Sequence, residues 1–146
     1  MADSDNSVPL AMLAARLHRA SEADFFARLT ESGHPGLRMR HPLVLQALEP
    51  DGARPGVLAA ELGVSQQSIG ELVDELERRG YVDRRPDPTD RRARLVTLTP
   101  KGSRAVREAY AIIDAMEADY AERAGTDDYR AARATISRLI DQLENR

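Results

Sequence analysis

The stretch that decides the fold is Asp87-Pro88-Thr89-Asp90-Arg91-Arg92-Ala93-Arg94-Leu95-Val96-Thr97-Leu98-Thr99-Pro100-Lys101-Gly102. It predicts the tip and return strand of a β-hairpin, running directly into a helix. Proline cannot donate to a strand ladder, so the two prolines favour a turn over residues 86–90 between strands at 81–85 and 94–98. Thr99 and Pro100 are typical of the cap and the first position of a helix. The arginines therefore lie on a projecting hairpin.

The segment before the hairpin predicts two helices joined by a tight turn. Residues 55–62 form the first helix, and Gly63 supplies the turn because glycine adopts left-handed conformations at little cost. Ser65 is a good N-cap for a second helix over residues 66–79, which ends at Gly80. In a helix-turn-helix protein, the start of the second helix reaches base edges in the major groove. That start reads Ser65, Gln66, Gln67 and Ser68, and glutamine and serine can both bond to bases. An ordinary capped helix remains the alternative.

Apolar spacing predicts four more helices, over residues 8–31, 40–48, 101–124 and 126–144, the last capped by Thr126 or Asp127. The first and the last flank a winged unit that is too small to cover both apolar stripes. Burying one Leu or Ile side chain contributes about 1.5–3 kcal/mol, so two exposed stripes favour pairing with a second copy of the chain.

Charge is distributed unevenly along the chain. The net charge is −3, yet residues 78–104 hold nine basic and three acidic side chains, a net +6. A basic block on an acidic body is typical of a small surface for double-stranded DNA. An arginine at a hairpin tip can enter the minor groove, and Asp90 is placed to hold the guanidinium of Arg92. The alternative is a solvated surface pair that contributes little.

Composition limits the class of protein. The 146 residues suit one domain, and the absence of cysteine excludes a disulfide scaffold and thiolate metal sites and fits a reducing cytoplasm. Apolar runs fall short of the roughly 20 residues that cross a bilayer, so we expect no membrane partner. The polar residues 1–7 lack the features of a secretory signal and are expected to form a frayed tail.

Enzymatic and metal chemistry find little support. His18, His34 and His41 are scattered without the i, i+4 spacing of a helical zinc site, so surface or packing roles are favoured over metal binding. The glycines lack the strand context of a phosphate-binding loop, and the serines lie in no nucleophile elbow. We therefore nominate no catalytic residue, metal or cofactor.

Four segments resemble the MarR family (multiple antibiotic resistance regulators). They are Leu58–Ser65 (LAAELGVS), Leu72–Val82 (LVDELERRGYV), Asp87–Arg92 (DPTDRR) and Leu98–Gly102 (LTPKG). The resemblance implies a mainly α fold with a small β-hairpin wing, in a homodimeric transcription regulator that usually represses promoters at pseudo-palindromic sites. It implies a single domain over residues 1–146, with residues 8–36 and 101–146 as the dimerisation region and residues 40–100 as the winged helix-turn-helix lobe.

The resemblance also implies the DNA-binding residues. Those of the recognition helix would be Ser65, Gln66, Gln67, Ser68, Ile69 and Glu71. Those of the wing would be Asp90, Arg91, Arg92 and Arg94, with Arg92 in the minor groove and Arg91 beside phosphate. Arg84 and Arg85 are further candidates for phosphate contacts.

One departure from the family pattern concerns the recognition helix. Glu71 stands where the family often has a basic residue, and Gly70 weakens the helix by about 1 kcal/mol relative to alanine. A carboxylate there repels phosphate but can accept from cytosine N4. Either the operator differs from the common type or affinity is low. A winged-helix module for protein interaction, with weak or no specific DNA binding, therefore stays as the alternative function.

A small-molecule effector is implied by the family's common behaviour. Tyr110, Met116 and Tyr120 on the long helix are candidates to border its pocket. Helix-spaced apolar residues are more often core, and that alternative is favoured from spacing alone. The sequence names no effector.

Overall fold

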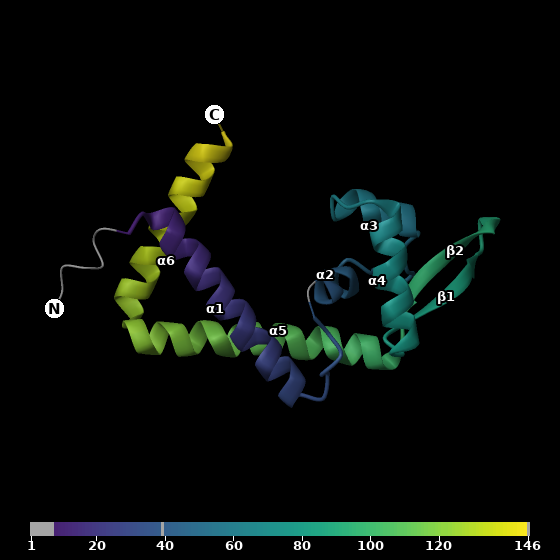
Figure 1. The fold of residues 1–146 in the computed structure, drawn as a ribbon, viewed down its shortest axis with the longest axis horizontal. Coiled ribbons are helices and arrows are strands. Elements are labelled where there is room, and N and C mark those ends of the chain that lie inside the picture. Colours follow the sequence, from purple (N-terminus) through teal and green to yellow (C-terminus); the bar gives the residue numbers. More distant parts are fainter. Residues whose placement is uncertain (1–7, 39, 146) are drawn as a thin grey trace. The chain divides into compact units, whose positions relative to one another are not determined.

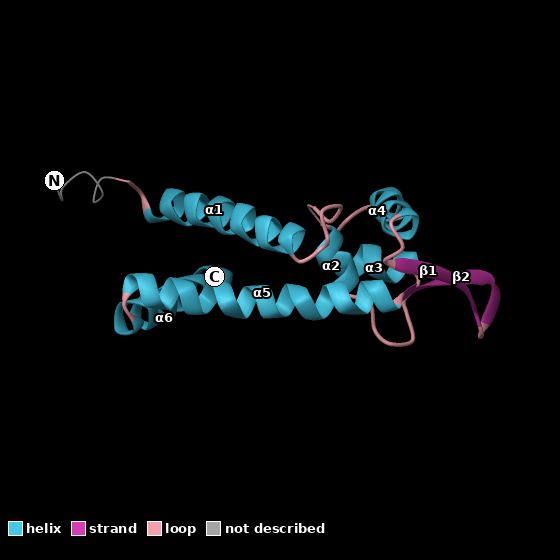
Figure 2. Cartoon of the chain, turned by 90° about the horizontal axis from the view of Figure 1, so that it is seen from below, coloured by secondary structure: helices cyan, strands magenta, loops and turns pink. Residues whose placement is uncertain are grey.

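The computed structural model describes residues 8–38 and 40–145, so the tail expected over residues 1–7 lies outside it. In these residues the fold is mainly helical with one two-stranded antiparallel sheet, which confirms the predicted fold class (Figures 1 and 2). The helices are α1 (Leu10–Glu31), α2 (His41–Gln46), α3 (Pro55–Glu61), α4 (Gln66–Arg78), α5 (Pro100–Ala124) and α6 (Thr126–Glu144). The strands are β1 (Val82–Asp87) and β2 (Asp90–Leu98). The chain divides into two compact units, the first ending at Tyr110 and the second beginning at Ala111, within α5.

The helix-turn-helix forms as its cap residues predict. Ser65 precedes α4, and its Oγ accepts from the backbone N of Ser68 at 3.1 Å. Gly63 and Gly80 have φ of +63° and +77°, a conformation that side chains disfavour. The apolar stripe of α4 packs into the core of the first unit, where the fully buried side chains include Leu29, Val44, Leu58, Ile69, Val73, Leu76, Val82 and Val96.

The wing differs from the prediction at its tip. β1 continues to Asp87, and Pro86 pairs with Arg94 in the register. The expected turn over residues 86–90 was therefore too long. In a two-stranded sheet both strands are edges, so the position without an N–H can point away from the ladder. The side chain of Asp87 closes the shorter tip by accepting from the backbone N of Thr89 at 2.8 Å and from its Oγ1 at 2.7 Å.

The junction between the wing and α5 explains the LTPKG segment. Thr99 Oγ1 accepts from Gly102 N at 3.1 Å and donates to the carbonyl of Gly80 at 2.6 Å, so one hydroxyl caps α5 and satisfies the end of α4. A Cβ on Gly102 would come within 2.1 Å of the backbone O of Tyr81. Lys101 Nζ donates to the carbonyl of Arg79 at 2.8 Å. The segment therefore sets how the helix-turn-helix joins the long helix.

A buried histidine joins three parts of the first unit. His34 Nδ1 lies 2.9 Å from the hydroxyl of Tyr81, and its Nε2 lies 2.8 Å from Glu108 Oε2. These contacts tie the segment after α1 to the residue before β1 and to α5. Burial is the main cause that raises the pKa of Tyr81. His34 therefore packs as a hydrogen-bonded core residue, and the described residues hold no group of three side chains suited to a metal ion.

The second unit is helical, and the cap of α6 lies one or two residues earlier than expected. Gly125, with φ of +88°, is the N-cap, so neither Thr126 nor Asp127 takes that role. Asp127 and Asp128 lie in the first turn instead, where carboxylates interact favourably with the helix dipole. None of the described helices is both long and apolar enough to span a bilayer.

Candidate nucleic-acid interface

The opening of α4 presents four exposed polar residues, Ser65, Gln66, Gln67 and Ser68. The Ser65 hydroxyl is engaged in capping and also donates to Ser68 Oγ at 2.9 Å. Gln67 Nε2 donates to Glu71 Oε1 at 3.2 Å across one turn. The side chains that can approach a base are therefore chiefly the two glutamine amides, and Gln67 must exchange its contact with Glu71 to do so.

Ile69 is a correction to the candidate recognition residues. Its side chain is fully buried, on the same stripe as Val73 and Leu76. At this position α4 faces the core. Ile69 therefore packs the helix against the core and is not available to contact DNA. Glu71 is exposed and lies on the outward side of the same helix.

The wing carries exposed arginines at Arg85, Arg91, Arg92 and Arg94. Asp90 does not hold the guanidinium of Arg92 in the predicted fork. Its Oδ1 accepts instead from the backbone N of Arg92 at 3.0 Å. Asp90 therefore constrains the backbone at the start of β2. It does not hold the guanidinium of Arg92.

Arg84, predicted as a phosphate contact, is engaged within the protein. It lies between two carboxylates of α4, with Nη2 2.5 Å from Asp74 Oδ1 and Nη1 paired with Glu77. Burial of the guanidinium lowers its pKa, but the hydrogen bonds and charges of the two carboxylates outweigh this and raise the pKa of Arg84 overall. Arg84 therefore fastens the wing to the recognition helix.

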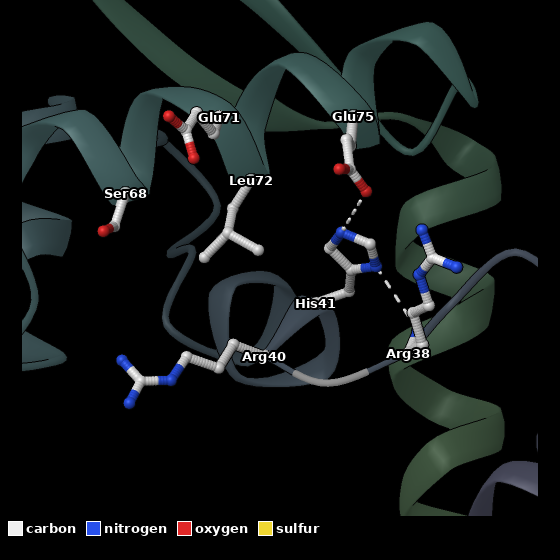
Figure 3. Close-up of a pocket in the computed structure, with 7 residues that line it drawn as sticks. All are labelled: Arg38, Arg40, His41, Ser68, Glu71, Leu72 and Glu75. Atoms are coloured by element: carbon white, nitrogen blue, oxygen red, sulfur yellow. Dashed lines mark hydrogen bonds and ion pairs between the residues drawn. The ribbon is translucent and has the colours of Figure 1, made fainter.

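A groove of about 470 Å³ runs along α4 on the side of α2 (Figure 3). Its lining residues are Arg38, Arg40, His41, Ser68, Glu71, Leu72 and Glu75. Arg40 lies on the wall opposite Ser68 and Glu71, so it adds a cation near the exposed start of α4. The sequence signal was the Arg38-x-Arg40 pair just before a short helix, which carries no recognisable spacing on its own.

His41 forms the inner wall of this groove and is 1% exposed. Its Nδ1 accepts from the backbone N of Arg38 at 3.3 Å. Its Nε2 lies 3.1 Å from Glu75 Oε2, without the geometry of a hydrogen bond. Burial lowers the pKa of His41, and the Glu75 carboxylate opposes that shift. The ring therefore supports α4 in its neutral form.

The three candidate effector residues lie on α5 in different surroundings. Tyr110 is exposed, Met116 is buried and Tyr120 is half-buried. Tyr110 ends the first compact unit, and the other two belong to the second.

Comparison with known proteins shows which family has this architecture. The model of the MarR family matches residues 36–93, which hold α2, the helix-turn-helix and most of the wing. The transcriptional repressor MprA of Escherichia coli K12 is 36% identical over 66 residues, 45% of this chain but 38% of MprA, so the matched region spans about two fifths of that relative.

Two solved structures match almost end to end. CouR from Rhodococcus jostii RHA1, solved with p-coumaroyl-CoA, is 31% identical over 91% of this chain and 92% of its own, with a TM-score of 0.66. A MarR-family transcriptional regulator from Rhodococcus sp. RHA1 is 30% identical over 95% of each chain, with a TM-score of 0.65. With the winged helix-turn-helix and this likeness together, the chain belongs to the MarR family of transcriptional regulators.

Proposed function

We propose that this chain is a homodimeric regulator that binds double-stranded DNA sequence-specifically and represses transcription until a small molecule intervenes. The observation that carries the proposal is the pairing of an exposed polar helix start with an exposed arginine wing in one unit, fastened together by Arg84, Asp74 and Glu77. Both elements are needed to read one half-site, one in each groove.

The recognition helix supplies the base contacts in this proposal. Gln66 and Gln67 can each pair bidentately with adenine, and Glu71 can accept from cytosine N4. Arg92 enters the minor groove, while Arg85, Arg91 and Arg94 contact phosphate. Arg40 adds a phosphate contact across the groove from Glu71 and offsets part of its repulsion. The acidic Glu71 then favours particular base pairs at the cost of general affinity.

The dimer brings two recognition helices to one site. Residues 8–36 and 101–146 are the proposed pairing region, because both ends of it carry exposed apolar side chains. On α1 these include Leu10, Met12 and Leu17, and on α6 they are Ile136, Leu139, Ile140 and Leu143. A two-fold axis through such a region spaces half-sites by about one helical turn of DNA.

A small-molecule effector completes the proposal. CouR, similar over nine tenths of this chain, was solved with p-coumaroyl-CoA, and MprA is a repressor. We infer that a ligand of this chain binds beside α5, where Tyr110, Met116 and Tyr120 are the candidate contacts. An aromatic ligand suits the two tyrosine rings.

The test begins with selection of bound fragments from random DNA, followed by gel-shift titration at several salt concentrations. Specific binding that falls steeply with salt is expected, because phosphate contacts release counterions. Arg92→Ala should weaken it by about 1–3 kcal/mol. Arg130→Ala, which removes an exposed arginine of α6, is the matched control and should leave it unchanged.

A protein-interaction module is the second candidate, favoured by the exposed Glu71 and the net charge of −3. Under that function the selection yields no enriched sequence, and Arg92→Ala behaves like the control. The two functions therefore give opposite results in one experiment.

A further inference from the structure

Arg54 reaches from the helix-turn-helix to the tip of the wing. It occupies the N-cap position of α3, but its side chain makes no capping bond and turns to the hairpin. Its Nε donates to Asp87 Oδ2 at 2.7 Å, and Nη2 lies 2.5 Å from the same oxygen. Nη2 also lies 3.5 Å from Thr89 Oγ1, and Nη1 lies 3.9 Å from Asp90 Oδ2. One guanidinium therefore contacts the end of β1, the turn and the start of β2.

Asp87 is the centre of this cluster. Its side chain is only 5% exposed, although it lies at the tip of a surface hairpin. The hydrogen bonds from the Thr89 hydroxyl and backbone, and then Arg54, lower the pKa of Asp87 to about 2. The carboxylate is therefore charged at neutral pH, and a covered charge needs a cation beside it. Arg54 is that cation.

The backbone around Arg54 is attached to the wing as well. Ala53 and Val96 exchange both hydrogen bonds, at 3.0 Å and 2.9 Å, so the loop before α3 adds a short third segment to the sheet. Gly52, with φ of +83°, allows this approach, because a Cβ there would come within 2.5 Å of Val96 O. The loop thus holds the base of the wing through its backbone and the tip through Arg54.

The cluster around Arg54 is connected to Arg92 through Asp90. Asp90, at the edge of the guanidinium, accepts from the backbone N of Arg92. Arg92 itself is exposed and lies nearer the tip of the hairpin than Val96, where the bridge to Ala53 forms. An isolated hairpin is marginally stable in water, so its tip needs outside support to hold one orientation.

We propose that Arg54 is a positioning residue for DNA binding, which fixes the wing tip through Asp87 and so presents Arg92 to the minor groove. This inference rests on the proposed function. It assigns Arg54 and Asp87 a part in DNA recognition, although neither needs to touch DNA. The competing role for Arg54, whose side chain is 43% exposed, is a direct contact to phosphate.

Asp87→Asn separates the two roles by the sign of its effect. The substitution removes one negative charge beside the duplex, so simple electrostatics predicts tighter binding. Loss of the Arg54 contact frees the wing tip and predicts weaker binding. Asp83→Asn, at an exposed acidic position of the same strand, is the matched control and should bind equally well or more tightly.

A double-mutant cycle then measures whether Arg54 and Arg92 are coupled in DNA binding. Gel-shift titrations at one salt concentration compare Arg54→Gln, Arg92→Ala and the double variant. Residues that act through one contact are non-additive, so the double variant should bind no more than about twofold more weakly than Arg92→Ala alone. Arg54→Lys keeps the charge and should recover part of the affinity lost in Arg54→Gln. Thermal unfolding of each variant checks that the fold remains.

The outcomes are distinct. Weaker binding by Asp87→Asn and Arg54→Gln, with non-additivity, supports the positioning role. Additive losses, or tighter binding by Asp87→Asn, overturn it and leave the proposed function intact. If Arg92→Ala binds like the unsubstituted protein, the proposed function fails first, and the cycle for Arg54 fails with it.

Discussion

Arg84 on β1 donates to Asp74 on α4, with 2.5 Å between Nη2 and Oδ1. Its neighbour Arg85 is exposed on the same strand. Side chains alternate between the two faces of a strand, so two consecutive arginines point to opposite faces and have different surroundings. Arg84 joins the wing to the recognition helix, and Arg85 remains available to phosphate.

This contrast gives a paired prediction. Arg84→Gln should lower the free energy of unfolding by about 1–2 kcal/mol, since each partly exposed ion pair contributes up to about 1 kcal/mol. It should leave the salt dependence of DNA binding unchanged. Arg85→Gln should do the reverse, with unchanged stability and a salt slope reduced by about 1. Urea unfolding and gel shifts at several salt concentrations measure both. A reduced salt slope in Arg84→Gln would place that guanidinium on the DNA after all.

Glu71 gives a prediction about specificity. Glu71→Arg should raise general DNA affinity and reduce the preference for the selected sequence, because a cation replaces a carboxylate near phosphate. Glu122→Arg on α5 makes the same change of net charge at an exposed position of the second unit and serves as the control. Gel shifts on the selected site and on an unrelated duplex measure both effects. Equal affinities for the two variants would place Glu71 away from the duplex.

Gly70 can be replaced without a steric penalty. It lies in the middle of α4, and a Cβ added there meets nothing within 4 Å. Gly70→Ala should therefore raise the free energy of unfolding by about 1 kcal/mol, the difference in helix propensity. Gly102→Ala is the contrasting variant, because its Cβ would lie 2.1 Å from Tyr81 O and it should destabilise the protein. Urea unfolding distinguishes the two, and a destabilised Gly70→Ala would reveal a constraint on this helix that its packing does not explain.

The local parts of this fold could be predicted from the sequence because their causes are local. Two hydroxyl groups cap helices by accepting from a backbone N–H three residues later, those of Ser65 and Thr99. Two glycines with positive φ form the turns, Gly63 and Gly80. All four act as their residue types predict. The periodicity of α4 also predicts a buried stripe. The resemblance assigns Ile69 to DNA because it gives the whole helix start one role, whereas its spacing places it with Val73 and Leu76.

The long-range contacts could not be read in the same way. The partners of Arg84 lie seven and ten residues before it, and those of Arg54 lie more than thirty residues after it. Nothing in the composition of an arginine-rich wing says which guanidinium meets a carboxylate and which stays exposed. That choice depends on how the hairpin twists onto α4, which only the folded chain determines. The extension of β1 to Asp87 has the same origin.

His41 gives a pH dependence with a defined sign. Its pKa is lowered by burial from 6.5, so the unfolded chain binds a proton more readily than the folded one. The associated stability is therefore complete above pH 6.5 and declines as the pH falls from there through the lower folded value. Glu75 opposes the shift, and Arg79 and Arg38 add to it. His41→Gln should lose less stability than the unsubstituted protein between pH 7.5 and 5.5. His18→Gln, at an exposed position, should retain the full dependence in urea unfolding.

The apolar face of α6 gives the last prediction. Ile136, Leu139, Ile140 and Leu143 recur at helical spacing, and each is exposed in the single chain. Burying such side chains contributes about 1.5–3 kcal/mol each, so association with a second copy of the chain through this face is favourable. Ile140→Glu should therefore convert the proposed dimer to a monomer in sedimentation at micromolar concentration. DNA affinity should fall with it, because one half-site alone gives fewer contacts. Arg138→Glu, at an exposed position of the same helix, should remain dimeric. A dimer that survives Ile140→Glu would move the interface away from this face, and a monomeric unsubstituted protein would remove the two-fold arrangement on which paired half-sites depend.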